Sequence, residues 1–211
     1  MEIYIIGAGG HAQQVIDVFE DNNYIIKGFF DDCYPDKLFI NKYKIINKIE
    51  YIDEYINTYI NIFCSIGDNI IRKNILNKLN KSHKINFINF INCISPCAKI
   101  SKNANIGTGN YIGNNVVISG GTIIGSNNIL NEGCIIPHDC KIGDFNHISI
   151  NSVCGGNVLI GNLNLIGLNS TILPKVIIGN SNTIGAGSVL IKSICDNKTY
   201  CGNPAKIKLA N

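Results

Sequence analysis

The sequence has no tryptophan, a single methionine and few charged side chains, which make up 16% of its 211 residues. The net charge is only +3, and the lysines are scattered, without a polybasic run or an aromatic platform among them. A nucleic-acid polymer is therefore not an expected partner. No apolar run approaches the roughly 20 residues that a membrane-spanning helix needs, so we expect no membrane partner either.

Metal-binding cysteine pairs are also missing. The chain has nine cysteines, but none forms a CxxC pair, and the pair that comes nearest, Cys93 and Cys97, stands alone. No signal peptide is recognisable, because Met1 leads directly into a short apolar run and a glycine loop. We interpret the cysteines as reduced, small core residues of a cytoplasmic protein, and we expect no metal.

Residues 1–92 alternate between strand-like and helix-like patterns. A short apolar run at 3–6 is followed by glycines and then by a segment with apolar residues three and four positions apart. Further strands are predicted at 25–30, 60–66 and 85–88, and a second helix at 71–79. This order predicts a small α/β domain with a parallel sheet covered by helices.

The second half has a period of six residues. An apolar residue recurs in phase from Ile100 to Leu190, and a glycine often follows it. The positions are Ile100, Ile106, Ile112, Ile118, Ile124, Leu130, Ile136, Ile142, Ile148, Cys154, Ile160, Ile166, Ile172, Ile178, Ile184 and Leu190.

A period of six fits a short strand followed by a corner. Three such units close one triangular coil of 18 residues, and stacked coils bury one apolar column on each face. Glycines after the apolar positions are expected to supply the unusual dihedral angles of the corners. The sequence therefore predicts an all-β parallel β-helix over residues 93–194, followed by a C-terminal tail at 195–211.

Several motifs along the chain resemble one family. They are Ile5–Ala12, Phe30-Asp31-Asp32, Ser65–Asn69 with Arg72, Pro137–Cys140, Ile142–His147, Cys154–Val158 and Gly202–Lys206. Together they resemble the sialic-acid O-acetyltransferases and nucleotide-amino-sugar N-acetyltransferases. The resemblance implies a Rossmann-like first domain over residues 1–92, a left-handed β-helix, acetyl-CoA as co-substrate and a homotrimer.

His138 is the leading candidate for a catalytic residue. It follows the inward Ile136 by two positions, and the coil period places Gly156 above it and Gly120 below it. Open space and an exposed backbone N–H suit a general base beside an oxyanion donor. Asp139 could orient the imidazole, with Asp144 as a competing partner.

Asn131 has two interpretations, a group that holds the catalytic histidine or a side chain that stabilises a corner. His147 lies half a coil beyond His138, so the two histidines are expected on different faces of the coil. They could meet only across a subunit interface, which predicts intersubunit active sites.

The resemblance also implies a groove for acetyl-CoA between neighbouring β-helices. Its expected contacts are His147, Gly156, Gly167, Gly185 and Lys206, the last of which could also be a solvated lysine.

The glycine loop of the first domain matches a dinucleotide fingerprint, Gly7-x-Gly9-x-x-Ala12, with Asp31 near the expected distance. The domain is too small for a second mononucleotide half, so we interpret the loop as a nucleotide-sugar site. The residues that the resemblance implies for the acceptor are Gly9, Gly10, His11, Asp31, Asp32 and Gly67.

The predicted function is N-acetylation of a nucleotide-linked 4-amino-4,6-dideoxy sugar of viosamine or bacillosamine type. O-acetylation of a sialic acid is the close alternative. A zinc hydro-lyase needs three histidine ligands, but the repeats supply only two. A non-catalytic β-helix that binds ice or carbohydrate would need a regular ladder of threonines on one face, and the sequence has none. An NAD-dependent enzyme is a further alternative, which nucleotide titration would test.

Overall fold

The computed structural model describes residues 1–208, which divide into two compact units, 1–96 and the chain from Cys97 onward. The first unit is built on a sheet with the strand order β3-β4-β2-β1-β5-β6, parallel except for the edge strand β3. The strands are β1 (Glu2–Ile6), β2 (Ile25–Phe30), β3 (Phe39–Ile40), β4 (Tyr43–Asn47), β5 (Ile60–Cys64) and β6 (Ile88–Phe90). The helices are α1 (Gly10–Asp21), α2 (Ile52–Tyr55) and α3 (Asn69–Leu79).

Apolar periodicity explains the core of this unit. Helix α1 buries Ala12, Val15, Ile16 and Phe19, the residues whose spacing predicted it. Helix α3 begins earlier than predicted, because the Asp68 side chain caps it by accepting from two backbone N–H groups. The strand predicted at 85–88 is wrong: a 3-10 turn occupies Ile85–Phe87 and strand β6 starts only at Ile88.

The strand order creates a switch point between β1 and β5. From β1 the chain proceeds to β2 and β4 on one side of the sheet, and then returns to β5 and β6 on the other side. The loops after β1 and β5 therefore diverge at the carboxyl ends of neighbouring strands. In open α/β sheets this crevice is where ligands bind.

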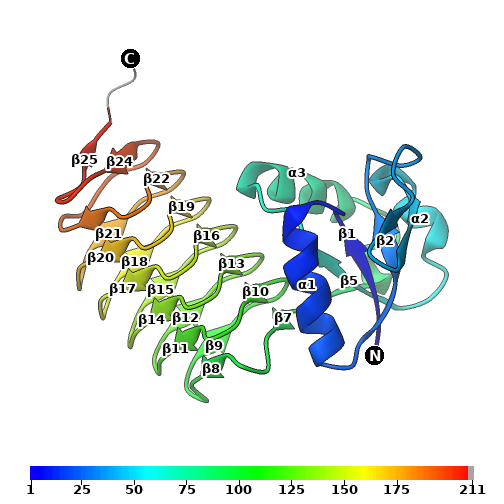
Figure 1. Cartoon of the computed structure of the whole chain (residues 1–211), viewed down its shortest axis with the longest axis horizontal. Helices are drawn as coiled ribbons and strands as arrows, with labels where there is room; N and C mark the ends of the chain where they lie inside the picture. Colours follow the sequence, from blue (N-terminus) through cyan, green and yellow to red (C-terminus); the bar gives the residue numbers. More distant parts are fainter. Residues whose placement is uncertain (209–211) are drawn as a thin grey trace. The chain divides into compact units, whose positions relative to one another are not determined.

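The second unit is a parallel β-helix of short coils (Figure 1). The two-residue strands from β8 (Lys99–Ile100) to β23 (Val189–Leu190) each end on one of the apolar positions that the six-residue period marked. Strands pair with those 18 residues away, as β13 (Ile129–Leu130) does with β16 (His147–Ile148). Beyond residue 194, β24 (Thr199–Cys201) extends one sheet and β25 (Lys206–Ile207) folds back on it.

The corners differ from the prediction. Left-handed backbone recurs every six residues, but three positions after the apolar residue rather than one. These positions are Gly109, Asn115, Gly121, Asn127, Gly133, Asp139, Phe145, Asn151, Asn157, Leu163, Asn169, Lys175, Ser181 and Gly187. Glycines directly after the apolar residue have a different reason: a methyl group on Gly107 would lie 2.7 Å from the carbonyl oxygen of Gly125. Close stacking of coils, not dihedral freedom, explains them.

Small polar side chains inside the coil donate hydrogen bonds to the corner carbonyls. At several strands the residue two positions before the strand end is polar, points inward and donates to a carbonyl 15 residues later. Thr122 donates to Pro137 at 2.6 Å, and Ser152 donates to Gly167 at 2.8 Å. These bonds satisfy backbone groups that the coil encloses.

One column of these inward positions is an asparagine ladder, formed by Asn110, Asn128, Asn146, Asn164 and Asn182. All five side chains are buried. The Nδ2 of Asn146 donates to Asn128 Oδ1 and to the Gly161 carbonyl, while its Oδ1 accepts from the N–H and Nδ2 of Asn164. The ladder joins successive coils through their interior.

Candidate functional site

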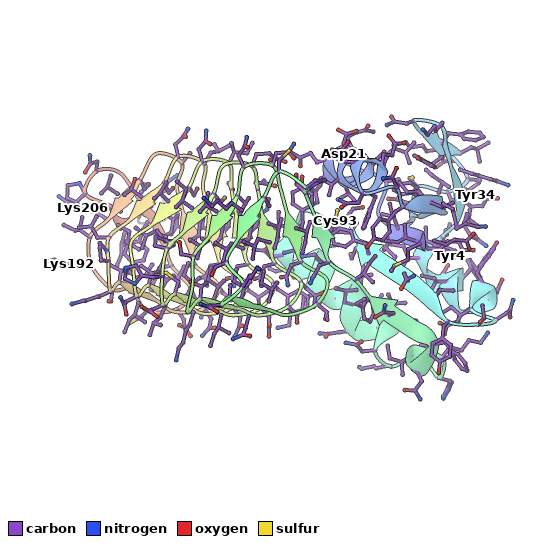
Figure 2. The ribbon with its side chains drawn as sticks, turned by 90° about the horizontal axis from the view of Figure 1, so that it is seen from below. Tyr4, Asp21, Tyr34, Cys93, Lys192 and Lys206 are labelled. Atoms are coloured by element: carbon purple, nitrogen blue, oxygen red, sulfur yellow. The ribbon has the colours of Figure 1, made fainter. Side chains whose placement is uncertain are left out.

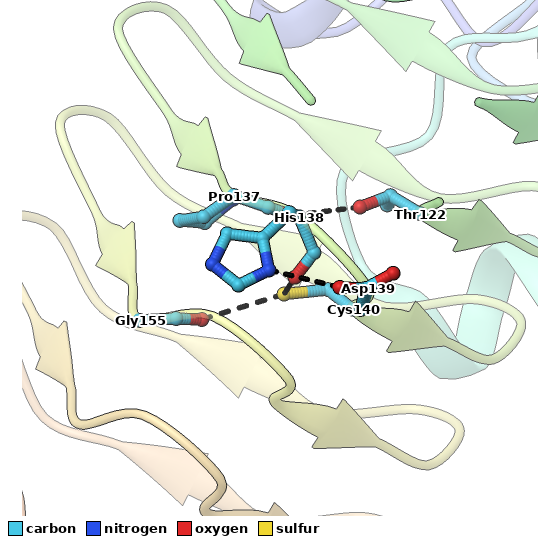
Figure 3. Close-up of polar contacts among 6 residues, drawn as sticks. All are labelled: Thr122, Pro137, His138, Asp139, Cys140 and Gly155. Atoms are coloured by element: carbon cyan, nitrogen blue, oxygen red, sulfur yellow. Dashed lines mark hydrogen bonds and ion pairs between the residues drawn. The ribbon is translucent and has the colours of Figure 1, made fainter. Parts of the chain in front are cut away.

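His138 lies at the corner between β14 (Ile135–Ile136) and β15 (Lys141–Ile142), with an exposed side chain. Its Nδ1 is 2.9 Å from Oδ2 of Asp139 (Figure 3). A carboxylate beside Nδ1 favours the tautomer with the proton on that nitrogen. This leaves the lone pair on Nε2, which is the atom a general base requires.

Gly156 lies directly over this nitrogen. The backbone N–H of Asn157 donates to the His138 carbonyl, so residue 156 sits one coil above. A methyl group built on Gly156 would lie 2.6 Å from Nε2 of His138. Glycine at this position therefore leaves the basic face of the imidazole open.

The amide of Gly156 differs from equivalent amides on another corner of the coil. There the N–H of Ser126 donates to Asp144 Oδ1, and that of Asp144 donates to Asn162 Oδ1, each 18 residues further along. The residue 18 positions after Gly156 is Pro174, which has no side-chain oxygen. The N–H beside His138 is therefore not capped in this way and is suited to stabilise an oxyanion.

We expect Gly156→Ala to lower turnover by about ten- to a hundredfold, because the methyl group displaces the imidazole from its position. Gly120→Ala is the matched control in the coil below His138, where an added methyl group would meet only Ser101 Oγ at 3.4 Å and Asn103 at 3.6 Å. Steady-state kinetics of both variants test this. Equal losses in the two variants would show that Gly156 has no special relation to the histidine.

Two predicted partners of His138 are placed elsewhere. Asp144 accepts from the Ser126 N–H at 2.7 Å, so Asp139 is the carboxylate at the imidazole. Of the two interpretations of Asn131, a contact with His138 is not formed within one chain, because its Nδ2 lies 3.0 Å from Nε2 of His147. The spacing along the chain did not predict this contact. Residue 131 directly follows β13 and residue 147 begins β16, and these two strands pair in the same sheet.

His147 and His138 occupy different faces of the coil, as expected. His147 belongs to β16, whereas His138 follows β14, which is part of another sheet. Gly167 and Gly185, which follow Ile166 and Ile184, lie on the His147 side together with Asn131. The predicted site residues of the β-helix thus form two groups on one chain, which a single protomer does not bring together.

Nearby thiols are not nucleophiles. Cys140 is buried and its Sγ lies 3.4 Å from the Gly155 carbonyl, on the inside of the coil (Figure 3). Burial raises the pKa of the Cys140 thiol and raises that of Cys134 to about 12. Because the thiolate is the reactive form, an acyl-cysteine intermediate is disfavoured here.

The glycine loop of the first unit lies at the switch point. Gly9 caps α1 and Gly10 begins it, and an added methyl group at either position, or at Gly67, would meet nothing within 4 Å. Gly7 is different: its φ is +96°, and a methyl group there would clash with Ile66. The loop is thus closely packed at Gly7 and open at the helix N-terminus, which suits an anionic group.

His11 lies in the first turn of α1. Its Nδ1 is 2.9 Å from Oε1 of Gln14, one turn later. Since the amide oxygen can only accept, the bond orients the ring with the proton on Nδ1.

The two aspartates after β2 have different roles. Asp31 accepts from the Ala8 N–H at 2.6 Å and from the Cys33 N–H at 2.8 Å, so it holds the glycine loop. Burial favours a higher pKa of the Asp31 carboxyl, but these bonds and nearby Lys37 outweigh it and lower that pKa. Asp32 instead lines a pocket of about 570 Å³.

The pocket beside Asp32 was not found from the sequence. It is also lined by Lys48, Glu50, Ile52, Lys78 and His83, which come from segments far apart in the chain. Arg72 was recognised only as part of a motif. Its buried guanidinium donates to the carbonyls of Ile66 and Gly67 and braces the second loop of the switch point.

Among residues 1–208, no three His, Cys, Asp or Glu side chains are grouped so that they could hold a metal ion. Nor does any helix in this described part have the length and apolar character to cross a membrane.

Part of this chain matches a known family model and a known relative. Residues 2–79 match the family model of the PglD N-terminal domain. Uncharacterized protein L142 of Acanthamoeba polyphaga mimivirus is 44% identical over 111 residues, which are 53% of this chain. The match spans 21% of the length of that relative.

Solved structures match over nearly the whole chain. PerB from Caulobacter crescentus, in complex with CoA and GDP-perosamine, is 27% identical with a TM-score of 0.89, covering 99% of this chain and 97% of that one. The acetyltransferase domain of PglB from Neisseria gonorrhoeae, in complex with acetyl coenzyme A, is 28% identical with a TM-score of 0.90, covering 98% of each chain.

Proposed function

We propose that this chain, which belongs to the hexapeptide-repeat family of nucleotide-sugar N-acetyltransferases, transfers acetyl from acetyl-CoA to a nucleotide-linked amino sugar. The observation that carries the proposal is the arrangement of Asp139, His138 and Gly156. It supplies an oriented base and an N–H donor side by side on an exposed corner. The resemblance to proteins that bind CoA and GDP-perosamine supplies the substrate class.

The reaction is a direct attack. The sugar amine attacks the thioester carbonyl carbon, and Nε2 of His138 takes the proton of the amine. The Gly156 N–H donates to the oxyanion of the tetrahedral intermediate. Collapse of the intermediate breaks the C–S bond, and the imidazolium returns the proton to the departing thiolate of CoA. Asp139 stabilises the imidazolium between these steps.

We further propose a homotrimer with active sites between subunits. His138 of one copy would then face His147, Gly167 and Gly185 of the next, which unites the two groups that one chain keeps apart. Leu165, paired with His147 and 38% exposed, and Leu168, 46% exposed, supply apolar surface on that side. Sedimentation is expected to give a trimer at working concentration, and a monomer there contradicts the proposal.

The acceptor is proposed to bind the first unit. The diphosphate would lie at the N-terminus of α1 beside Gly9, Gly10 and His11, and the base in the pocket beside Asp32. A nucleotide site favours a nucleotide-linked 4-amino-4,6-dideoxy sugar over a sialic acid, and therefore N- over O-acetylation. We place the reaction in the cytoplasm, with no metal.

A thiol-release assay with acetyl-CoA tests the function. We expect turnover with at least one UDP-, dTDP- or GDP-linked 4-amino sugar, and none with free sialic acid. Mass spectrometry of the product should show an acetamido group. Thiol release with sialic acid alone would replace the proposal by O-acetylation.

A further inference from the structure

The glycine loop between β1 and α1 is held by side chains on both sides of Ala8. The Ala8 N–H donates to Oδ2 of Asp31 at 2.6 Å, and the Ala8 carbonyl accepts from Nζ of Lys37 at 2.8 Å. One residue earlier, the Gly7 carbonyl accepts from the hydroxyl of Ser65 at 2.6 Å. The segments that follow β2 and β5 therefore fix the path of the loop together.

The contact of Lys37 sets the direction of one backbone N–H. The peptide unit between Ala8 and Gly9 is trans, so its N–H points opposite to its carbonyl. Because Lys37 holds the Ala8 carbonyl, the Gly9 N–H points away from the lysine. Gly9 is the N-cap of α1, and an added methyl group on it would meet nothing within 4 Å. Lys37 thus orients one of the N–H groups that a helix N-terminus offers to an anion.

The segment that carries Lys37 is ordered by the same aspartate that binds Ala8. Asp31 accepts from the Cys33 N–H through its side chain and from the Tyr34 N–H through its carbonyl. The Lys37 N–H in turn donates to the Cys33 carbonyl at 3.1 Å. Tyr34, in the middle of this segment, is labelled near the right-hand edge of Figure 2. The backbone of Lys37 is thus fixed relative to Asp31, and its side chain returns to the loop.

We propose that Lys37 is a positioning residue for the acceptor: by holding the Ala8 carbonyl, it keeps the Gly9 N–H turned toward the diphosphate of the nucleotide sugar. This inference rests on the proposed function, because it takes the diphosphate to lie at the N-terminus of α1. Lys37 itself is exposed, and contacts of exposed charged side chains contribute little to folding. Its removal should therefore change binding of the acceptor and not the stability of the protein.

The first test is the kinetics of Lys37→Met, which removes the ammonium and keeps a long, unbranched side chain. Loss of a hydrogen bond from a charged donor should raise KM for the nucleotide sugar about tenfold. The values of kcat at saturating acceptor, KM for acetyl-CoA and Tm should stay as in wild type. Lys37→Arg should restore most of the acceptor KM, because a guanidinium also donates to a carbonyl.

The second test is amide hydrogen exchange in the ligand-free protein, which needs no turnover. Without the ammonium the backbone around Ala8 opens more often, so its amide should exchange about fivefold faster or more in Lys37→Met. The Gly7 amide, which donates to the Phe30 carbonyl at 2.8 Å, is the internal control and should not change. A raised acceptor KM with unchanged exchange at Ala8 would mean that Lys37 binds the ligand directly, and overturns the positioning role.

Lys42→Met is the matched control. Lys42 is also an exposed lysine that contacts α1, but its Nζ lies 2.8 Å from Oε1 of Glu20, near the C-terminal end of the helix. Its acceptor KM should stay within about twofold of wild type. An equal rise in Lys42→Met, a rise of KM for acetyl-CoA in Lys37→Met, or no rescue by Lys37→Arg overturns the assignment. If wild type turns over no acceptor, the proposed function fails, and the exchange at Ala8 still decides whether Lys37 holds the loop.

Discussion

His138→Ala should lower kcat by about 10²- to 10⁴-fold, the usual contribution of a positioned general base. The protein should keep its stability, because the imidazole is 64% exposed and its side-chain bond is to the exposed Asp139. Binding of CoA should also persist, since the backbone of Gly156 and the later coils are unchanged. Thiol release measured at saturating acetyl-CoA and acceptor is the direct test.

Lys141→Ala is a suitable control for this variant. Lys141 is exposed and begins the strand that follows the histidine corner, but its side chain is not part of the proposed chemistry. Its turnover should remain within twofold of wild type. Full turnover of His138→Ala would exclude the histidine as the base and refute the mechanism.

Asn146→Leu should destabilise the protein by about 3–6 kcal/mol. The leucine removes the four side-chain bonds described above for Asn146, a central member of the asparagine ladder. It leaves the Gly161 carbonyl and the Asn164 N–H buried without their partner, at about 1–3 kcal/mol each, and the larger side chain must also fit a closed core. The free energy of unfolding from urea titration, at one protein concentration, measures the change.

Asn162→Leu is the matched control on the outside of the coil. Asn162 also stacks on residues 18 positions away, accepting from the Asp144 N–H and donating to Asn180, but it is exposed. Water can replace its bonds, so the loss should stay below about 1 kcal/mol. Equal destabilisation by the two substitutions would mean that burial of the ladder contributes nothing special.

The β-helix was predictable because one residue in six must be apolar and must stay in phase. A slip of one position would expose a whole buried column, so the pattern in the sequence is strict. For the same reason His138, Gly156 and Gly120 could be aligned from the coil length alone. The α1 segment was predictable from its spacing, whereas the segment at 85–88 was not, since four residues, three of them apolar, do not distinguish a turn from a strand.

The sequence by itself therefore determined the coil period, the column that contains His138 and Gly156, and the separation of His147 onto another face. Only the tertiary structure decided which side chains touch. It assigned Asp139 rather than Asp144 to His138, gave Asn131 to His147, and turned Asp31 toward the glycine loop. The reason is physical: strand register follows from chain spacing, but hydrogen-bond partners depend on where the folded backbone leaves donors and acceptors to be satisfied.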